Sequence, residues 1–277
     1  EQLITYPIEV EMGGIQDLLE IRSISKFGLS QVTLIFEEGS DLYRSRQLVS
    51  ERLQAVAAEM PPDVTPQMAP ISTGLGEIYH YTVAYKADAK DIPSDPKDQL
   101  RQLKLAQDYI VKPLLRTVPG ITEVNTSGGY TREIVVMPDP DKLRSVGVTI
   151  SELADTIGEN TQNAGGSIVE KGGESVSVRS LGRVQSAEEV ANLPLKFAGT
   201  PTTLRVKDVA EVAIGSGVRT GAATLNGKEA VIGSALMLIG ENSRLVSERV
   251  HNKIDDIQRK LPPGMEIITL YNRTDLV

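Results

Sequence analysis

The first part of the chain shows helical and then strand-like spacing of its apolar residues. Between residues 2 and 12 they recur at roughly helical intervals as far as Gly13-Gly14, which predicts a helix. Leu18–Ile24 and Gln31–Phe36 are rich in β-branched residues, and Lys26-Phe27-Gly28 lies between them. This pattern predicts a β-hairpin.

A second helix is predicted directly after this hairpin. Ser40-Asp41 is an N-cap signal, and the apolar stripe that follows it ends at Pro61-Pro62. A further strand is expected near Val64–Met68. The predicted order is therefore helix, strand, strand, helix, strand.

One pentapeptide occurs twice. Leu48-Val49-Ser50-Glu51-Arg52 recurs as the segment from Leu245 to Arg249, and each copy follows an apolar strand pattern and a glycine. Both predicted helices end in Pro-Pro, but the interval from pentapeptide to Pro-Pro is longer by about one helical turn in the second copy. The repeat predicts a duplicated β-α-β unit with a one-turn insertion.

Another split β-α-β unit is predicted between the two copies. Its strand Glu77–Lys86 precedes a helix from Lys97 to Arg116, and strands follow at Thr122–Thr126 and Glu133–Met137. Pro113 lies inside the helix, where its missing N–H should produce a kink.

An inserted domain is predicted after Asp139-Pro140-Asp141. It begins with a short helix at Ile150–Ile157. The Gly-rich stretch from Gly165 to Gly173 and the alternating run Ser175–Ser180 predict a hairpin arm. A helical turn from Ala187 and strands near residues 204–212 complete the domain.

Composition excludes several classes of protein. The 277 residues are 40% hydrophobic and 24% charged, which is typical of globular domains and long enough for two or more. Lys and Arg number 29 against 37 Asp and Glu, a net charge of −8 that disfavours nucleic acid as a partner. There is no cysteine, so thiolate chemistry is excluded. No apolar stretch is long enough to span a bilayer, and the start at Glu1 without Met predicts a fragment of a longer protein.

The common catalytic motifs are absent. The sequence contains no HExxH, GxSxG, Walker or dinucleotide-binding pattern, so we predict that the chain is not an enzyme and has no cofactor. His251 lies beside the apolar stripe of the last long helix, where an ordinary solvated pair with Asp255 is expected. The six methionines are scattered, which disfavours a soft Cu(I) or Ag(I) site within this chain.

Glu77 and His80 are the residues with the chemistry of a metal site. Strand alternation places Glu77 on the opposite face of its strand from His80, so one ion should not contact both. A zinc or cobalt site would need a partner from elsewhere, such as Asp108 on the following helix. Spacing alone favours the plainer interpretation that Glu77 and Asp108 are solvated carboxylates.

Several segments resemble one transporter family. They are Glu1–Glu9, Ser72–Tyr79, Val118–Asn125, Gly128–Tyr130, Asn163–Gly166, Leu204–Ala210 and Leu225–Gly227. In these segments the chain resembles the first large periplasmic loop of heavy-metal efflux pumps of the resistance-nodulation-division (RND) superfamily. The resemblance covers essentially the whole chain.

The resemblance implies an α+β fold with two ferredoxin-like β-α-β porter subdomains and an inserted α+β docking subdomain with a hairpin arm. The first porter subdomain would be residues 1–72, without its opening strand. The second would be 73–141 and 218–277, and the docking subdomain 142–217. The hairpin at Gly165–Val178 would reach into a neighbouring protomer.

The resemblance also implies a function. The full pump would be a proton-driven homotrimer in a bacterial inner membrane, with this loop in the periplasm. It would pass metal cations to an outer-membrane channel with the help of a periplasmic adaptor protein. Proton-carrying residues and the second periplasmic loop lie outside this chain, so the fragment alone should transport nothing.

The resemblance also points to particular metals. Glu at the Gly-x-Gly-Glu position, here Glu77, resembles the branch that exports zinc, cobalt, cadmium and nickel, whereas the copper and silver branch tends to carry an uncharged residue there. Glu77 would then be an entrance or proximal ligand, with Asp108 as its companion.

Two alternatives remain open at this point. A drug exporter of the same superfamily would share the fold, but drug pockets are normally aromatic and this chain is only 4% aromatic. A cytosolic regulatory module of tandem ferredoxin-like domains would also explain the duplication. It would not explain the Gly-rich arm.

Overall fold

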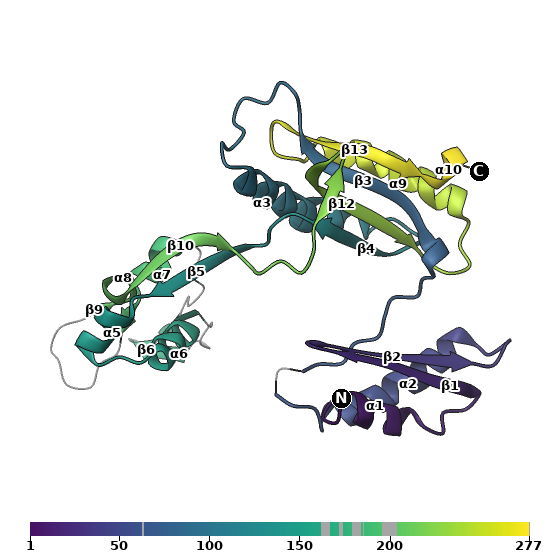
Figure 1. Cartoon of the computed structure of the whole chain (residues 1–277), viewed down its shortest axis with the longest axis horizontal. Coiled ribbons are helices and arrows are strands. Elements are labelled where there is room, and N and C mark those ends of the chain that lie inside the picture. The colour runs from purple at the N-terminus through teal and green to yellow at the C-terminus, as the bar shows by residue number, and fades with distance from the viewer. Residues whose placement is uncertain are drawn as a thin grey trace. The chain divides into compact units, whose positions relative to one another are not determined.

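The structure is a computed structural model that describes residues 1–62, 64–161, 167–171, 174–178, 184, 186–195 and 204–276 (Figure 1). The chain divides into two compact units, residues 1–70 and residues 71–277. Each unit has its own hydrophobic core, and the larger unit has two.

The first unit contains the predicted helix, hairpin and helix. Its elements are α1 (Thr5–Met12), β1 (Leu18–Lys26), β2 (Leu29–Phe36) and α2 (Leu42–Ala57). β1 and β2 are antiparallel, and both helices lie on the same face of this hairpin (Figure 1). The core between the layers is formed by Ile8, Met12, Ile15 and Val56.

The strand predicted near Val64–Met68 is wrong, because these residues form no ladder. Among the described residues β1 and β2 pair only with each other, and the segment at Val64–Met68 forms no ladder with either strand. An extended segment becomes a strand only when its backbone groups find a partner strand. The segment is instead fastened at its end, where Arg46 Nη2 donates to the carbonyl of Ala69 at 2.9 Å.

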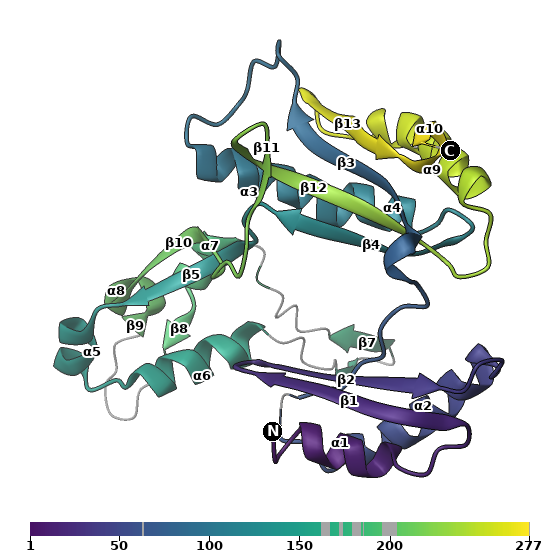
Figure 2. The same ribbon diagram turned by 45° about the vertical axis from the view of Figure 1, so that its right-hand side comes forward.

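The second unit is built on a larger antiparallel sheet. Its long strands are β3 (Glu77–Tyr85), β4 (Ile121–Gly128), β12 (Lys228–Met237) and β13 (Met265–Asn272). Their order across the sheet is β4-β12-β3-β13. The short strand β11 (Ala223–Leu225) pairs with the start of β12. The helices α3 (Pro96–Ala106), α4 (Lys112–Leu115) and α9 (Ser243–Gln258) lie on one side of it (Figure 2). The element order β-α-β-β-α-β is that of a ferredoxin-like fold, which confirms the predicted fold class.

The core of this unit lies between the sheet and its helices. Tyr79 and Tyr81 of β3 are fully buried there, together with Val124 of β4 and Val250 of α9. None of the helices described for this unit packs on the opposite face of the sheet. Apolar Ile268 on β13 and polar His80 on β3 are both at least partly exposed there.

The helix that contains Pro113 is interrupted by a π-helical turn, while the predicted kink stays a prediction. α3 continues into a π-helical segment, Gln107–Val111, and α4 begins directly after it. Pro113 has no N–H to donate one turn back, so the backbone widens before it. Gln107 and Asp108 therefore project from an irregular turn.

The duplication is visible in the geometry of α2 and α9. Each helix has 16 residues and follows a glycine with φ of 89°, Gly39 or Gly240. Their N-caps are Asp41 and Asn242, so the offset between equivalent positions is 242 − 41 = 201. The pentapeptides are offset by only 245 − 48 = 197, one turn less. The helices are therefore equivalent, but the identical pentapeptides are not, and the predicted one-turn insertion within the helix is wrong.

A further group of elements forms a lobe with its own core. They are β5 (Arg132–Pro138), α5 (Pro140–Val146), α6 (Ile150–Thr161), α7 (Ala187–Ala191), β8 (Pro194–Leu195), β9 (Leu204–Arg205), α8 (Val206–Val209) and β10 (Ala210–Ser216). The other elements are the strands β6 (Ser167–Lys171) and β7 (Glu174–Val178) and the short helix α10 (Arg273–Leu276), which contacts α9. β5 pairs with β10, and β6 pairs with β7 as the predicted hairpin. Gly165, Gly166, Gly172 and Gly173 of the predicted arm lie outside the described residues.

Candidate functional site

Glu77 begins β3 immediately after a short 3₁₀ turn, Gly74–Gly76. A glycine at position 76 fits this close packing, because a Cβ atom would overlap the Ser72 hydroxyl and lie 3.2 Å from the carbonyl of Met237. The turn leads directly into β3, where the side chain of Glu77 is 45% exposed.

A β-bulge brings Glu77 and His80 to the same face of the sheet. Tyr79 opposes Ala235 and Glu77 opposes Leu236, so Ile78 is an extra residue on β3. The extra residue reverses the alternation of side chains. Glu77 Oε2 consequently lies 3.6 Å from His80 Nε2. The prediction that these two side chains point to opposite faces is wrong, and the bulge is the reason.

The imidazole of His80 is held on both sides by neighbouring strands. Its Nδ1 lies 2.8 Å from the hydroxyl of Ser234, the residue opposite it on β12. Its ring centroid is 5.4 Å from that of Tyr271, the residue opposite it on β13. The side chain remains 28% exposed. The ring is therefore oriented, while its Nε2 edge faces Glu77.

Asp108 lies in a different environment. Its Oδ1 accepts a hydrogen bond from Thr126 Oγ1 at 2.8 Å, and its Oδ2 is 3.8 Å from Lys104 Nζ. The side chain also lines a small cavity of about 340 Å³ with Tyr130 and Arg132. These neighbours stabilise a carboxylate, but two of them carry positive charge that opposes a cation.

Glu77 and Asp108 are not brought together. Thr126, which binds Asp108, opposes Gly233, and Gly233 opposes Tyr81. Tyr81 is four positions from Glu77, roughly 13 Å along a strand. Asp108 also lies on the helical side of the sheet and Glu77 on the other. Within the described part of the chain, no three His, Asp or Glu side chains are grouped so as to hold a metal ion.

A buried polar pair lies beneath Asp108. Gln107 Nε2 donates to the Tyr81 hydroxyl at 3.0 Å, and both side chains are fully buried. Burial raises the pKa of Tyr81; the hydrogen bond from Gln107 opposes this shift, and the charge of Asp108 adds to it. Tyr81 therefore stays neutral, and its ring is part of the hydrophobic core.

His251 has a structural partner. Its Nδ1 lies 3.1 Å from the Tyr79 hydroxyl, which is also 2.7 Å from Thr269 Oγ1. The ring thus completes a hydrogen-bonded group on β3, β13 and α9. The structure pairs His251 with Tyr79, where the sequence suggested Asp255.

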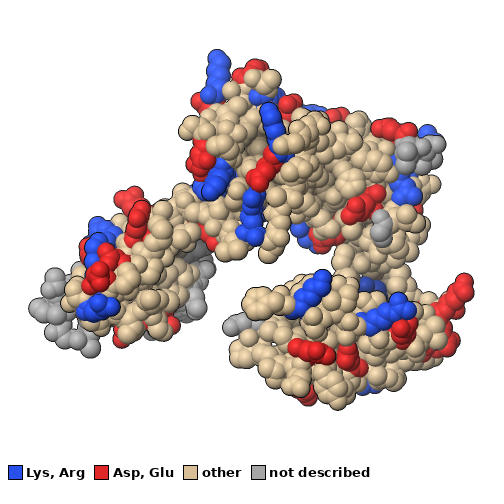
Figure 3. All heavy atoms as spheres, in the orientation of Figure 1, with Lys and Arg blue, Asp and Glu red and all other residues tan. Residues whose placement is uncertain are grey.

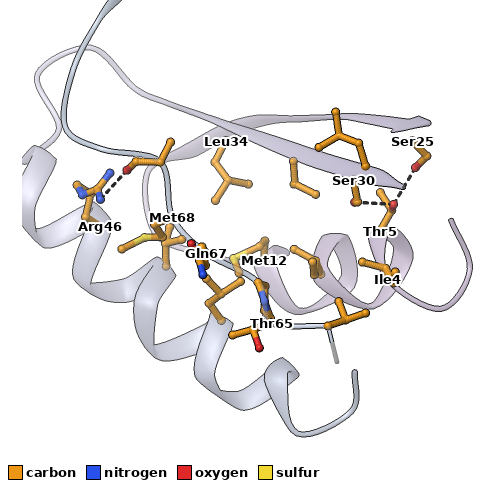
Figure 4. Close-up of a pocket in the computed structure, with 18 of the residues that line it drawn as sticks. Ile4, Thr5, Met12, Ser25, Ser30, Leu34, Arg46, Thr65, Gln67 and Met68 are labelled. Carbon is orange, nitrogen blue, oxygen red and sulfur yellow. Dashed lines mark hydrogen bonds between the residues drawn. The ribbon is translucent and has the colours of Figure 1, made fainter. Parts of the chain in front are cut away.

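The first unit contains a large cavity of a different character (Figure 4). It measures about 910 Å³ and is lined mainly by aliphatic side chains of α1, β2, α2 and residues 64–69. Of the described residues that line it, Glu1 is the one carboxylate and none is a histidine. A divalent cation would find too few hard or borderline ligands there.

Acidic and basic side chains are interspersed over the face shown in Figure 3, so this face presents no basic patch for a polyanion. None of the helices in the described part of the chain has the length and hydrophobicity that crossing a bilayer requires.

Sequence reasoning missed the proximity of His80 to Glu77. The sequence contains one sign of the bulge, the adjacent apolar residues Ile78 and Tyr79 near the start of the strand. Both side chains are buried, and two consecutive buried residues in an otherwise alternating strand are typical of a bulge.

Comparisons with known proteins agree on one family. The family model described as the AcrB/AcrD/AcrF family matches residues 1–277. Protein HelA of Legionella pneumophila is 46% identical over the whole chain, the cobalt-zinc-cadmium resistance protein CzcA of Cupriavidus metallidurans 45%, and the cation efflux system protein CusA of Escherichia coli K12 34%. The crystal structure of a heavy metal efflux pump matches 99% of the chain with a TM-score of 0.85 and 31% identity. The chain spans 26% of the length of each of these proteins.

Proposed function

Because the chain belongs to the AcrB/AcrD/AcrF family, we propose that it forms part of a heavy-metal efflux transporter and contacts the exported cation through Glu77. Its relatives include a cobalt-zinc-cadmium resistance protein and a cation efflux protein. As the chain covers about a quarter of their length, the activity of the whole transporter is part of the proposal.

The observation that carries the proposal is the position of Glu77. Its carboxylate is about half exposed on the face of the sheet that no helix of its unit covers. A carboxylate binds a borderline dication without the tight cage of thiolates that would release it slowly. Such a group suits a site where an ion must bind and leave again.

The choice of metal follows from the same chemistry. Carboxylate and imidazole ligands favour zinc, cobalt, cadmium and nickel over Cu(I) and Ag(I), which prefer sulfur. Identity is higher with the cobalt-zinc-cadmium resistance protein, at 45%, than with the cation efflux protein CusA, at 34%. We therefore propose divalent cations as the cargo and no resident cofactor.

The surrounding assembly is proposed by analogy with the family. The transporter would be a proton-driven homotrimer of a bacterial inner membrane, and this chain its periplasmic part. An adaptor protein and an outer-membrane channel would complete the export route. Asp108 is proposed only as a separate and weaker contact for the cation, because it lies on the other side of the sheet from Glu77 and Thr126 and Lys104 already engage its carboxylate.

Metal tolerance of cells tests the proposal. The full-length transporter with Glu77→Ala would be expressed in a metal-sensitive strain, with Glu266→Ala as the control, since Glu266 lies on the same sheet opposite Ala84. We expect tolerance to zinc and cobalt to fall with Glu77→Ala and to persist with Glu266→Ala. Unchanged tolerance at equal expression would remove Glu77 from the site. Growth against dyes and antibiotics would reveal a drug exporter instead.

A further inference from the structure

We propose that His80 and Glu77 together form a two-ligand site for a borderline divalent cation on the helix-free face of the sheet. The inference rests on the proposed function and deepens it, because it adds a nitrogen ligand to the carboxylate. It is carried by the β-bulge at Ile78, which places both side chains on one face.

The separation of the two donor atoms suits a bridging ion. The 3.6 Å between Glu77 Oε2 and His80 Nε2 is longer than a normal hydrogen bond of about 2.7–3.2 Å. Zinc binds both kinds of donor at about 2.0–2.2 Å. For an ion at those distances from both atoms, the angle Glu77 Oε2–ion–His80 Nε2 would be roughly 120°, close to the angles of a tetrahedral or trigonal site.

The support of the imidazole is the kind found around metal ligands. Histidines that bind metals usually hydrogen-bond through their second ring nitrogen, which fixes the tautomer and the ring plane. Here Nδ1 lies 2.8 Å from Ser234 Oγ. When Nδ1 carries the proton and donates a hydrogen bond to Ser234 Oγ, the lone pair of Nε2 faces Glu77 and the solvent.

The charges around the pair favour weak and reversible binding. Arg273 donates to the carbonyl of Leu75, two residues before Glu77, so a positive charge lies nearby. Two protein ligands leave the other coordination positions to water or to other parts of the transporter. Imidazole also disfavours Mg²⁺ and Ca²⁺, which prefer oxygen ligands. The site would thus select borderline cations and release them readily.

Nuclear magnetic resonance of the imidazole nitrogens tests this site in the 277-residue chain. The chain has only two histidines, so His251, held by Tyr79, is an internal control. We expect Zn²⁺ to shift the Nε2 signal of His80 and to leave that of His251 unchanged, while equal Mg²⁺ shifts neither. Glu77→Gln should weaken the response to Zn²⁺ at least about tenfold, and Ser234→Ala by a similar factor, with Ser234→Thr retaining it.

The outcomes separate this site from the proposed function. Equal shifts of both histidines, no shift of His80, or an unchanged response in Glu77→Gln would each overturn the site. In the full-length transporter, His80→Gln should lower zinc tolerance and His251→Gln should not. If Glu77→Ala abolishes tolerance while His80→Gln keeps it, the pair is refuted as a transport element and the proposed function stands. If Zn²⁺ binds the pair but neither substitution alters tolerance, the site stands and the proposed function fails.

Discussion

Replacing Gly233 with alanine should disrupt the core of the larger sheet. Gly233 lies on β12 directly opposite Tyr81 of β3. A Cβ atom at this position would overlap the ring and hydroxyl of Tyr81. Tyr81 is fully buried, and its hydroxyl accepts from Gln107 Nε2 at 3.0 Å, so the ring has little room to move away.

The expected cost follows from these contacts. Overpacking a core typically costs about 1–3 kcal/mol. Displacing the ring would also break the hydrogen bond from Gln107 and leave Nε2 with only its longer contact of 3.3 Å to Thr126 Oγ1, at a further cost of about 0.5–1.5 kcal/mol. Gln107 Oε1 has no hydrogen-bond partner among the described residues, so the buried side chain depends on these two donor contacts. We therefore expect the free energy of opening that governs hydrogen exchange in β3 and β12 to fall by about 1.5–4.5 kcal/mol, which is a loss of protection of roughly tenfold or more.

Hydrogen exchange is the suitable assay, because it reports on β3 and β12 separately from the first unit. Gly221→Ala is the matched control, as nothing lies within 4 Å of its added Cβ. In a Tyr81→Leu background the cost of Gly233→Ala should shrink, since the overlapping ring is gone. A change below about 0.5 kcal/mol for Gly233→Ala in the unaltered chain would refute the reasoning.

Two further predictions concern pH and helix capping. Folding raises the pKa of Tyr81 above its usual value, so the unfolded chain loses this proton first as the pH rises. The free energy of unfolding should be unaffected by this group below about pH 9 and should fall above about pH 10, by at most about 1.4 kcal/mol per pH unit. Alkaline urea titrations should show a shallower fall for Tyr81→Phe but not for the exposed Tyr109→Phe; equal slopes would contradict this. Asn242 Oδ1 accepts from the backbone N–H groups of Arg244 and Leu245, so Asn242→Ala should cost about 1 kcal/mol. Exchange in the first turn of α9 measures this cost, and unchanged protection there would count against the cap.

Much of the fold could be predicted from local patterns in the sequence. The cap signal at Asp41, the apolar stripe behind it and the turn at Phe27-Gly28 act over a few residues, and the structure contains the helix and hairpin that they predict. The strand at Val64–Met68 failed because a strand depends on a partner that local sequence does not specify. The equivalence of α2 and α9 was correct at the level of the helices and wrong for the pentapeptides.

The candidate site was harder to predict for the same reason. Glu77 and His80 could be identified by residue type, but their relation depends on the pairing of β3 with β12. The bulge at Ile78 reverses the side-chain alternation, and the adjacent apolar residues Ile78-Tyr79 are its only local sign in the sequence. Asp108 was placed on a helix with a kink expected at Pro113, whereas the π-helical turn and the contacts with Thr126 and Lys104 decide its surroundings.

Anomalous diffraction from crystals of the full-length transporter soaked in zinc locates the exported ion most directly. Our interpretation predicts a peak at the zinc edge within about 2.0–2.2 Å of a Glu77 carboxylate oxygen. The same peak should be lost in Glu77→Gln crystals. Zinc peaks confined to other parts of the transporter, with none at Glu77, would contradict it.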